Sequence, residues 1–525
     1  MSGDFPLAFS GIHNNNMNSY DGQLTCPEVR FTNQQERNSY HMIDRRSFIK
    51  GAGAAVFSMG ATELLADTSK AKRKPNFVVI FIDDMGYGDI EPFGSKVNKT
   101  PQLNRMAAEG MKLTSFYVAA PVCTPSRAAL MTGCYPKRVG LATGSWGVVL
   151  FAKDAHGLNP KEKTIASILA DAGYATGCFG KWHLGDQPEY FPTNHGFDTY
   201  FGIPYSNDMW PLNPESKEWE VAPCPLPVMR NDKAVDIVKD MDDQAQLCKR
   251  FTDEAVAFMR DNRDRPFFVY LPHAFVHHPR NARSKFMDRA SPEKELDKQK
   301  MVLEPEHAMR QRTRAQIEEV DWSAGRILDT IKELGLAENT MVIFTSDNGG
   351  GWGCENAPLR GGKGTTWEGG MREPTLAWWP GTIGANSTCD EIATTMDLLP
   401  TFAGLAGAKV PDDRVIDGKN IAPLLLGRPN AKSPHQAFFY YKENNLRAVR
   451  SGKWKLHTDG RLYNLQKDIG ERHNVAEQNP DILKRLTKYL DQARQDLDDP
   501  KNCRPVGKNT NPQHLVPLER AKDNQ

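Results

Sequence analysis

The chain has 525 residues, of which 39% are hydrophobic and 25% charged, with 42 glycines and 35 prolines. This is the composition of a globular protein rich in turns, and it excludes wholesale disorder, collagen and coiled coil. The 66 basic and 65 acidic side chains leave a net charge of +1, so no overall field favours nucleic acid or an acidic membrane as partner. The length allows roughly two to four domains, or one large α/β domain and a smaller one.

The N-terminal region has the layout of an export signal. The basic stretch Asp44 to Lys50, with paired Arg45 and Arg46, precedes an apolar, small-residue run from Gly51 to Thr62. That run fits a signal peptide and falls short of the about 20 residues that a membrane span needs. The pair followed by SFIK resembles a twin-arginine signal, which implies the twin-arginine export machinery and a periplasmic or secreted bacterial protein.

The mature chain is therefore expected to begin near Asp67 and to have no membrane span. Residues 42–66 are assigned to the signal peptide. The polar, asparagine-rich stretch 1–41 shows no periodicity and is interpreted as a non-native or disordered extension, with Met42 as the natural start.

Three apolar runs predict buried central strands. The run from Asn76 to Ile82 is followed by two aspartates, and the run from Thr340 to Thr345 is followed by SDNGG. The run from Pro266 to Leu271 is followed by a histidine cluster. Ligands of open α/β sheets bind beyond the carboxyl ends of the strands. We therefore expect these polar groups to meet at one edge of the sheet.

Helical patterns alternate with these strands. One helix is predicted from Pro101, one from Ile165 to before Gly173, and one through Ile317 to before Gly335. This alternation predicts an α/β fold with a large, mainly parallel sheet sandwiched by helices. The charged, aperiodic stretch from Ser284 to His307 is expected to be a surface excursion.

The pattern of apolar and polar residues changes after about residue 430. Short extended pieces (AFFYY, LRAVRS, KWKLH and RLYNL) are followed by an amphipathic helix through Ile482, Leu486 and Leu490. This predicts a smaller C-terminal antiparallel sheet plus one helix. The expected division is a catalytic domain at 67–430 and a C-terminal subdomain at 431–525.

One of the nine cysteines stands at a predicted helix start, in the sequence CTPSR that begins at Cys123. Proline is favoured near the first turn of a helix, and the free N–H groups there favour an anion. Arg127, one helical turn on, can face the same pocket. The residues alone allow two interpretations, a nucleophile beside a fixed cation or a small buried cysteine. No cysteine pair forms a CxxC motif that would suggest structural zinc.

The pentapeptide resembles the Cys-x-Pro-Ser-Arg signature of the type I, formylglycine-dependent sulfatases, arylsulfatase-like members of the alkaline phosphatase superfamily. The resemblance extends in order along nearly the whole mature chain. It is carried by GKWHLG (180–185), NHGFD (194–198), GIPYSND (202–208), TSDNG (345–349), LRGGKGTTWEGG (359–370), AVRSGKWKL (448–456) and LYNL (462–465).

The resemblance implies a cofactor and a modified residue. A formylglycine-generating maturation enzyme would oxidise Cys123, and the hydrate would present one hydroxyl that attacks sulfur and a second that later expels sulfate. The metal ligands would be Asp83, Asp84, Asp347 and Asn348, with the modified residue 123 nearby. This all-oxygen set suits Ca²⁺, with Mg²⁺ as the alternative.

The same resemblance implies the remaining roles. Asp347 would accept the proton of the attacking hydroxyl, while Arg127 and His183 hold the diol and His183 accepts the second proton. Lys181 and Lys363 would bind sulfate oxygens. His277 is the candidate for the acid that protonates the leaving group, because it stands two residues before Pro279 as in the family pattern. His273 is the runner-up for that role. Ser206 is a candidate for a hydroxyl near the sulfate.

The expected function is hydrolysis of sulfate monoesters, of a sulfated carbohydrate or an aryl sulfate. One alternative is a phosphonate or phosphodiester hydrolase of the same superfamily. Another is a carbohydrate-binding relative whose cysteine is never converted. Specificity is expected in the loops 208–232 and 284–307, where Trp210 and Trp219 are candidates for stacking on a sugar.

Overall fold

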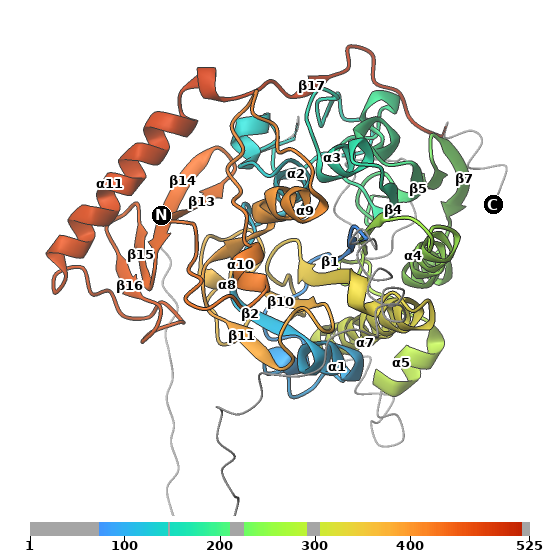
Figure 1. Cartoon of the computed structure of the whole chain (residues 1–525), viewed down its shortest axis with the longest axis horizontal. Helices are drawn as coiled ribbons and strands as arrows, with labels where there is room; N and C mark the ends of the chain where they lie inside the picture. Colours follow the sequence, from blue (N-terminus) through green and yellow to red (C-terminus); the bar gives the residue numbers. More distant parts are fainter. Residues whose placement is uncertain (1–72, 145–146, 210–224, 291–304, 517–525) are drawn as a thin grey trace, which may run out of the picture. The chain divides into compact units, whose positions relative to one another are not determined.

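A large mixed sheet forms the centre of the fold (Figure 1). The computed structural model describes residues 73–144, 147–209, 225–290 and 305–516. Five central strands are parallel, in the order β9, β1, β8, β4, β5. Their bounds are Thr340–Ser346 (β9), Asn76–Ile82 (β1), Phe267–Pro272 (β8), Ala175–Lys181 (β4) and Thr199–Ile203 (β5).

Antiparallel strands extend this sheet at both sides. On one side lie β10 (Arg372–Trp378) and β2 (Met111–Tyr117), with β11 (Ser387–Cys389) and β12 (Ala393–Thr394) parallel to β2. On the other lie β6 (Leu226–Arg230) and β7 (Lys233–Val238). The predicted class, a large and mainly parallel sheet, is confirmed by the central strands.

Helices cover both faces of the sheet because β1 is apolar on both sides. Phe77, Val79 and Phe81 pack in one core cluster, and the intervening Val78 and Ile80 pack in the other. The first cluster takes side chains from α2 (Cys123–Thr132), α3 (Ile165–Asp171), α9 (Leu398–Ala406) and α10 (Ala422–Leu425). The second takes them from α1 (Pro101–Glu109), α4 (Met241–Asp261), α5 (Ser284–Ala290) and α7 (Pro305–Glu333).

The stretch from Ser284 to His307 differs from expectation where it is described. Residues Ser284–Ala290 form α5, and α7 begins at Pro305. Phe286 is buried in the core beside Trp322, with ring centroids 6.4 Å apart. The expectation of an aperiodic excursion is wrong for α5, because one aromatic side chain anchors a short helix that is otherwise too polar to show a period.

A second sheet follows near the C-terminus (Figure 1). Its consecutive strands are antiparallel, and leucines of α11 (Pro480–Leu497) pack on it. The strands are β13 (Phe438–Lys442), β14 (Asn445–Ser451), β15 (Trp454–His457) and β16 (Leu462–Asn464). The predicted small antiparallel sheet plus helix is therefore confirmed, while the domain boundary near residue 430 stays a prediction.

A buried ionic group joins the two sheets, and we call it the inter-sheet cluster: Glu368, Arg372, Arg450, Lys455, His457 and Glu471. Glu368 belongs to α8 (Glu368–Met371), directly before β10. Its carboxylate accepts hydrogen bonds from the hydroxyl groups of Tyr117 and Tyr440, at 2.6 and 2.7 Å. The cluster thus fixes the second sheet against the edge of the first.

The other regular elements are short. They are β3 (His156–Gly157) paired with β17 (Gly507–Lys508), and the 3-10 turns Glu91–Phe93, Pro136–Val139, Pro188–Tyr190, Pro192–His195, Ala337–Asn339, Thr395–Asp397 and Pro500–Asn502. Within the described ranges, no helix combines the length and the apolar character that crossing a membrane requires. The predicted signal peptide with Arg45 and Arg46, the start near Asp67, and Trp210 and Trp219 lie outside the described residues.

Candidate active site

The predicted site residues gather at the carboxyl ends of four neighbouring strands. Asp83 and Asp84 follow β1, Asp347 and Asn348 follow β9, and the segments after β4 and β8 supply histidines. The three carboxylates are at most 2% exposed. Buried acidic groups at one edge of a parallel sheet form the kind of crevice in which α/β proteins bind ligands.

Three cations face these three carboxylates. The Arg127 guanidinium donates from Nε and Nη2 to Asp347 Oδ2, at 3.0 and 2.7 Å. Lys181 Nζ lies 2.5 Å from Asp83 Oδ2, and Lys363 Nζ lies 2.7 Å from Asp84 Oδ2. The cluster of six groups is formally neutral.

The oxygen atoms of the cluster fit a hard cation. Asp83 Oδ1 and Asn348 Oδ1 are buried and have no hydrogen-bond partner among the described residues. Leaving such an atom buried without a donor costs about 1–3 kcal/mol, a cost that a bound cation removes. Ligand atoms of Asp83, Asp84 and His277 also lie within 4.8 Å of one another. Carboxylate and amide oxygens are the donors that Ca²⁺ and Mg²⁺ take.

The backbone brings the two acidic loops together. Asp84 adopts a φ of 63°, a left-handed conformation that is uncommon for a residue with a side chain. Its N–H donates to Asp347 Oδ1 at 3.2 Å, and Asn348 Nδ2 donates to Asp84 Oδ1 at 2.8 Å. These bonds fix the two pairs of predicted ligands against each other.

The carboxylates differ in proton affinity. Burial alone would raise the pKa of Asp83, but the charges of Lys181, His277 and Arg127 hold it below its usual range. Burial and the neighbouring Asp83 charge raise the pKa of Asp347 to about 7, against the opposing charge of Arg127. Asp347 is therefore the carboxylate of this group best suited to accept a proton near neutral pH.

Cys123 is the first residue of α2 and is 3% exposed. Burial raises the pKa of its thiol to about 11, although Lys181 and Lys363 act in the opposite direction. A thiol that stays protonated at neutral pH is a weak nucleophile. The environment thus disfavours a thiolate nucleophile at this position.

His183 is fixed as a neutral base. Its Nε2 lies 2.8 Å from the carbonyl oxygen of Leu150 and must carry the proton to bond it, while its Nδ1 is buried without a partner among the described residues. Burial and the charges of Lys181 and Arg127 lower its pKa well below the usual value. Its unprotonated Nδ1 is free to accept a proton.

The two candidate acids, His277 and His273, face different surroundings. His277 Nε2 lies 3.7 Å from Asp84 Oδ2, whereas His273 Nε2 lies 2.9 Å from the Ser323 hydroxyl on α7. Burial and the charge of Lys363 lower the pKa of His277 to about 3. An acid role therefore requires a bound anion to raise the proton affinity of this imidazole.

Ser206 also lies in the site, since its Oγ accepts a hydrogen bond from Lys181 Nζ at 3.0 Å. The structure also gives a role to the glycines that follow Asn348, of which Gly351 lies outside the sequence motifs. A Cβ at Gly351 would lie 3.1 Å from Asp84 Oδ2, and one at Gly349 would lie 1.8 Å from the carbonyl oxygen of Gly369. The GGG run after Asn348 was the available signal, because glycines mark close backbone approach.

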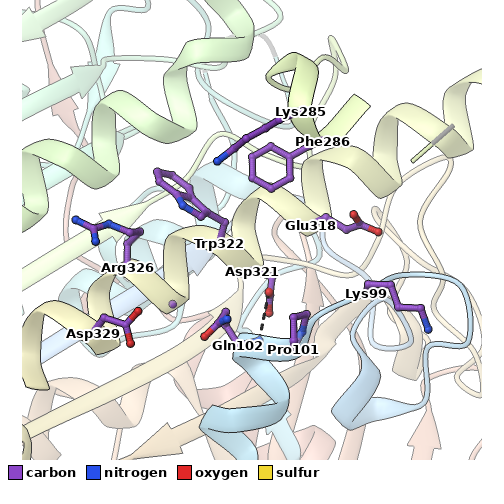
Figure 2. Close-up of a pocket in the computed structure, with 11 residues that line it drawn as sticks. Lys99, Pro101, Gln102, Lys285, Phe286, Glu318, Asp321, Trp322, Arg326 and Asp329 are labelled. Atoms are coloured by element: carbon purple, nitrogen blue, oxygen red, sulfur yellow. Dashed lines mark hydrogen bonds between the residues drawn. The ribbon is translucent and has the colours of Figure 1, made fainter. Parts of the chain in front are cut away.

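A separate cavity of about 490 Å³ lies between α1, α5 and α7 (Figure 2). Asp321 accepts hydrogen bonds there from the backbone N–H groups of Gln102 and Leu103 and so caps α1. Arg283 and Lys285 lie over the Trp322 ring, at 4.1 and 5.0 Å from its centroid. None of the predicted site residues lines this cavity.

Comparisons with known proteins place the chain among characterised enzymes. The Sulfatase family model matches residues 75–408, and the N-sulphoglucosamine sulphohydrolase C-terminal model matches residues 362–496. Human arylsulfatase A is 37% identical over 477 residues, which cover 81% of this chain and 89% of the relative. Rat N-acetylgalactosamine-6-sulfatase is 37% identical over 420 residues, which cover 76% of this chain and 74% of the relative.

A solved structure is also similar to this chain. The crystal structure of Ps i-CgsB in complex with k-i-k-neocarrahexaose is 30% identical with a TM-score of 0.69, covering 80% of this chain and 92% of that one. The matched sequence spans both the acidic strand ends and the CTPSR helix start. The chain thus belongs to the sulfatase family and is a sulfuric ester hydrolase of the alkaline phosphatase superfamily.

Proposed function

We propose that this enzyme hydrolyses sulfate monoesters of a carbohydrate, using formylglycine derived from Cys123 and one bound divalent cation. The observation that carries the proposal is the cluster of three buried carboxylates facing three fixed cations, with two oxygens left without donors. The cation, Ca²⁺ or alternatively Mg²⁺, would be held by Asp83, Asp84, Asp347 and Asn348. When bound, it supplies Lewis-acid polarisation of the sulfate.

The chain's own residues would bind and orient the substrate. Lys181 and Lys363 lie at the cluster with their ammonium groups directed at Asp83 and Asp84, positions from which they can bind sulfate oxygens as point charges. Ser206 shares the Lys181 ammonium and would add a hydroxyl donor. The pocket suits a singly charged group with three terminal oxygens.

Proton transfer would be divided among three residues. The formylglycine hydrate would supply a nucleophilic hydroxyl at position 123, and Asp347 would accept its proton. Arg127 Nη1 donates to the carbonyl oxygen of Lys181 at 2.9 Å, which holds the guanidinium beside the start of α2. His183, with a free Nδ1, would accept the proton of the second hydroxyl.

His277 would protonate the leaving oxygen. Its Nδ1 donates to the carbonyl oxygen of His278 at 2.8 Å, which leaves Nε2 facing Asp84 and the sulfate position. A sugar alkoxide is a poor leaving group, so a general acid is most needed for a carbohydrate substrate.

A carbohydrate is the proposed substrate because two of the similar proteins carry sugar-related names, the N-acetylgalactosamine-6-sulfatase and the structure holding a neocarrahexaose. A periplasmic or secreted location after twin-arginine export would match that substrate. Aryl sulfates, with better leaving groups, should be turned over as well. A phosphonate or phosphodiester hydrolase is the second candidate, since the same cation cradle can bind a phosphoryl group.

Two measurements test the proposal. Peptide mass spectrometry of active enzyme should show formylglycine at position 123, and Cys123→Ala should abolish activity without lowering the melting temperature. A fully active preparation with an unmodified thiol would rule the mechanism out. A screen of sulfated mono- and oligosaccharides against an aryl phosphonate decides the substrate, and faster turnover of the phosphonate would favour the second candidate.

A further inference from the structure

A second group of potential ligands adjoins the catalytic cluster on the side of His277. Ligand atoms of Asp208, His277 and His278 all lie within 4.8 Å of one another. His278 Nε2 is 3.0 Å from Asp208 Oδ2. The two loops that carry them follow β5 and β8, strands that both pair with β4.

The backbone holds His277 in the form that a metal ion requires. The carbonyl oxygen of His278 accepts hydrogen bonds from His277 Nδ1 at 2.8 Å and from Asn207 Nδ2 at 3.1 Å. A metal-binding imidazole usually donates its second ring N–H to a carbonyl or carboxylate, which fixes its orientation and its tautomer. His277 has this arrangement before any ion is bound, with the Nε2 lone pair available.

The neighbouring ring of His278 is stacked on His277 and has to rotate before its Nε2 can point at an ion bound to His277. The His277 and His278 rings are stacked, with centroids 4.3 Å apart and planes inclined by 29°. His277 is buried, whereas the side chain of His278 is 40% exposed and that of Asp208 is 24% exposed. An ion therefore has a route from solvent to a donor set whose inner member is already oriented.

The ligand atoms of Asp208, His277 and His278 suit a different cation from the one proposed for the catalytic cluster. Two imidazole nitrogens and one carboxylate oxygen suit Zn²⁺ and similar borderline ions, whereas Ca²⁺ and Mg²⁺ take oxygen ligands. Three protein ligands also leave a coordination position open. We propose that Asp208, His277 and His278 form a second, inhibitory cation site of the Zn²⁺ class.

Inhibition follows from the shared residue. An ion on Nε2 of His277 occupies the lone pair that would carry the proton to the leaving group. The opposing charges of Lys181 and Lys363 weaken binding there, while Asp84 and Asp208 strengthen it. The site should therefore be reversible and should be emptied by a chelator at a concentration that leaves the catalytic cation in place.

The test uses the full-length mature enzyme loaded with Ca²⁺. Co²⁺, a spectroscopic substitute for Zn²⁺, should give a visible absorption band with the wild type, and Zn²⁺ should inhibit turnover of a sulfated monosaccharide far more than turnover of nitrophenyl sulfate, whose leaving group needs no proton. His278→Phe keeps a stacked ring but removes a ligand. It should retain basal turnover, lose the Co²⁺ band, and need at least about tenfold more Zn²⁺ for half inhibition, a loss of the size seen when metal sites are perturbed.

A matched control is His473→Phe, which changes a histidine whose side chain is 80% exposed and lies 3.5 Å from Asp468. This variant should keep both the Co²⁺ band and the Zn²⁺ sensitivity of the wild type. No Co²⁺ band in the wild type, or an unchanged band in His278→Phe, would overturn the site and reduce the Asp208–His278 contact to a simple ion pair. The Co²⁺ measurement needs no turnover, so it stays informative even if the proposed sulfatase reaction fails.

Discussion

The catalytic cluster and the inter-sheet cluster are both buried groups of opposite charges, yet they differ in completeness. In the inter-sheet cluster, Glu471 accepts from the backbone N–H of Glu368 at 2.7 Å, from His457 at 3.0 Å and from Lys455 at 2.9 Å. In the catalytic cluster, Asp83 Oδ1 has no donor within the described chain. Burial and charge alone therefore do not mark a functional site. The oxygen without a donor is what separates the catalytic cluster from the inter-sheet cluster.

The comparison predicts its largest effect at Asp84. Asp84→Ala removes a proposed ligand and leaves Lys363 without its partner, so bound metal and turnover should both be lost. The melting temperature of the metal-free protein should also fall, because Lys363 loses its buried counter-ion. Metal content and turnover measure the result, with Asp459→Ala as a surface control. A fully metal-loaded but inactive variant would show that the ligand set is wrong.

The second prediction concerns the proton donor. His277→Ala should slow a sugar sulfate by about 10²–10⁴-fold, the range of general acid catalysis. Nitrophenyl sulfate, whose leaving group needs no proton, should be affected far less. Steady-state rates on the two substrates give the ratio. Equal losses on both would move the acid role to His273 or Lys363.

Removal of Glu368 should lower the free energy of unfolding and leave the catalytic rate unchanged. Glu368→Ala leaves Lys455, Arg372 and Arg450 buried without this counter-ion, and breaking a buried pair from one side costs about 3–5 kcal/mol. Urea unfolding of the metal-loaded protein should show that loss, with turnover per folded molecule retained. A loss of turnover at full folding would mean that the two clusters are coupled.

The smallest effect near neutral pH is expected from a buried histidine that belongs to neither cluster. Burial lowers the pKa of His273 from 6.5 to about 3, so the folded state resists its protonation while the unfolded chain accepts it. The contribution of His273 to the free energy of unfolding is therefore fully present above pH 6.5. It is lost as the pH drops, at about 1.4 kcal/mol per pH unit. His273→Gln should reduce that slope in denaturant titrations between pH 6 and 4. An unchanged slope would assign the acid sensitivity to other groups.

The sequence predicts the strand ends well because the rule behind them is local. An apolar β-branched run that ends in Asp83 and Asp84 needs no distant partner to be interpreted, and parallel strands must share an edge. The bond between His183 and the carbonyl oxygen of Leu150 is different, since the partner lies in a loop 33 residues away. The contact between Glu368 and Tyr117 spans 251 residues. Such pairs depend on how layers pack, and no periodicity encodes them.

The burial of Cys123 limits when this side chain can be modified. The side chain is 3% exposed at the start of a helix whose ten residues are all buried. The active site of another protein cannot reach an atom enclosed in this way without unfolding α2 and its neighbours. Any enzyme that oxidises this cysteine must therefore work on the nascent or unfolded chain. If the protein then leaves the cytoplasm folded, conversion has to be finished before transport, so the speed of folding limits the yield of active molecules.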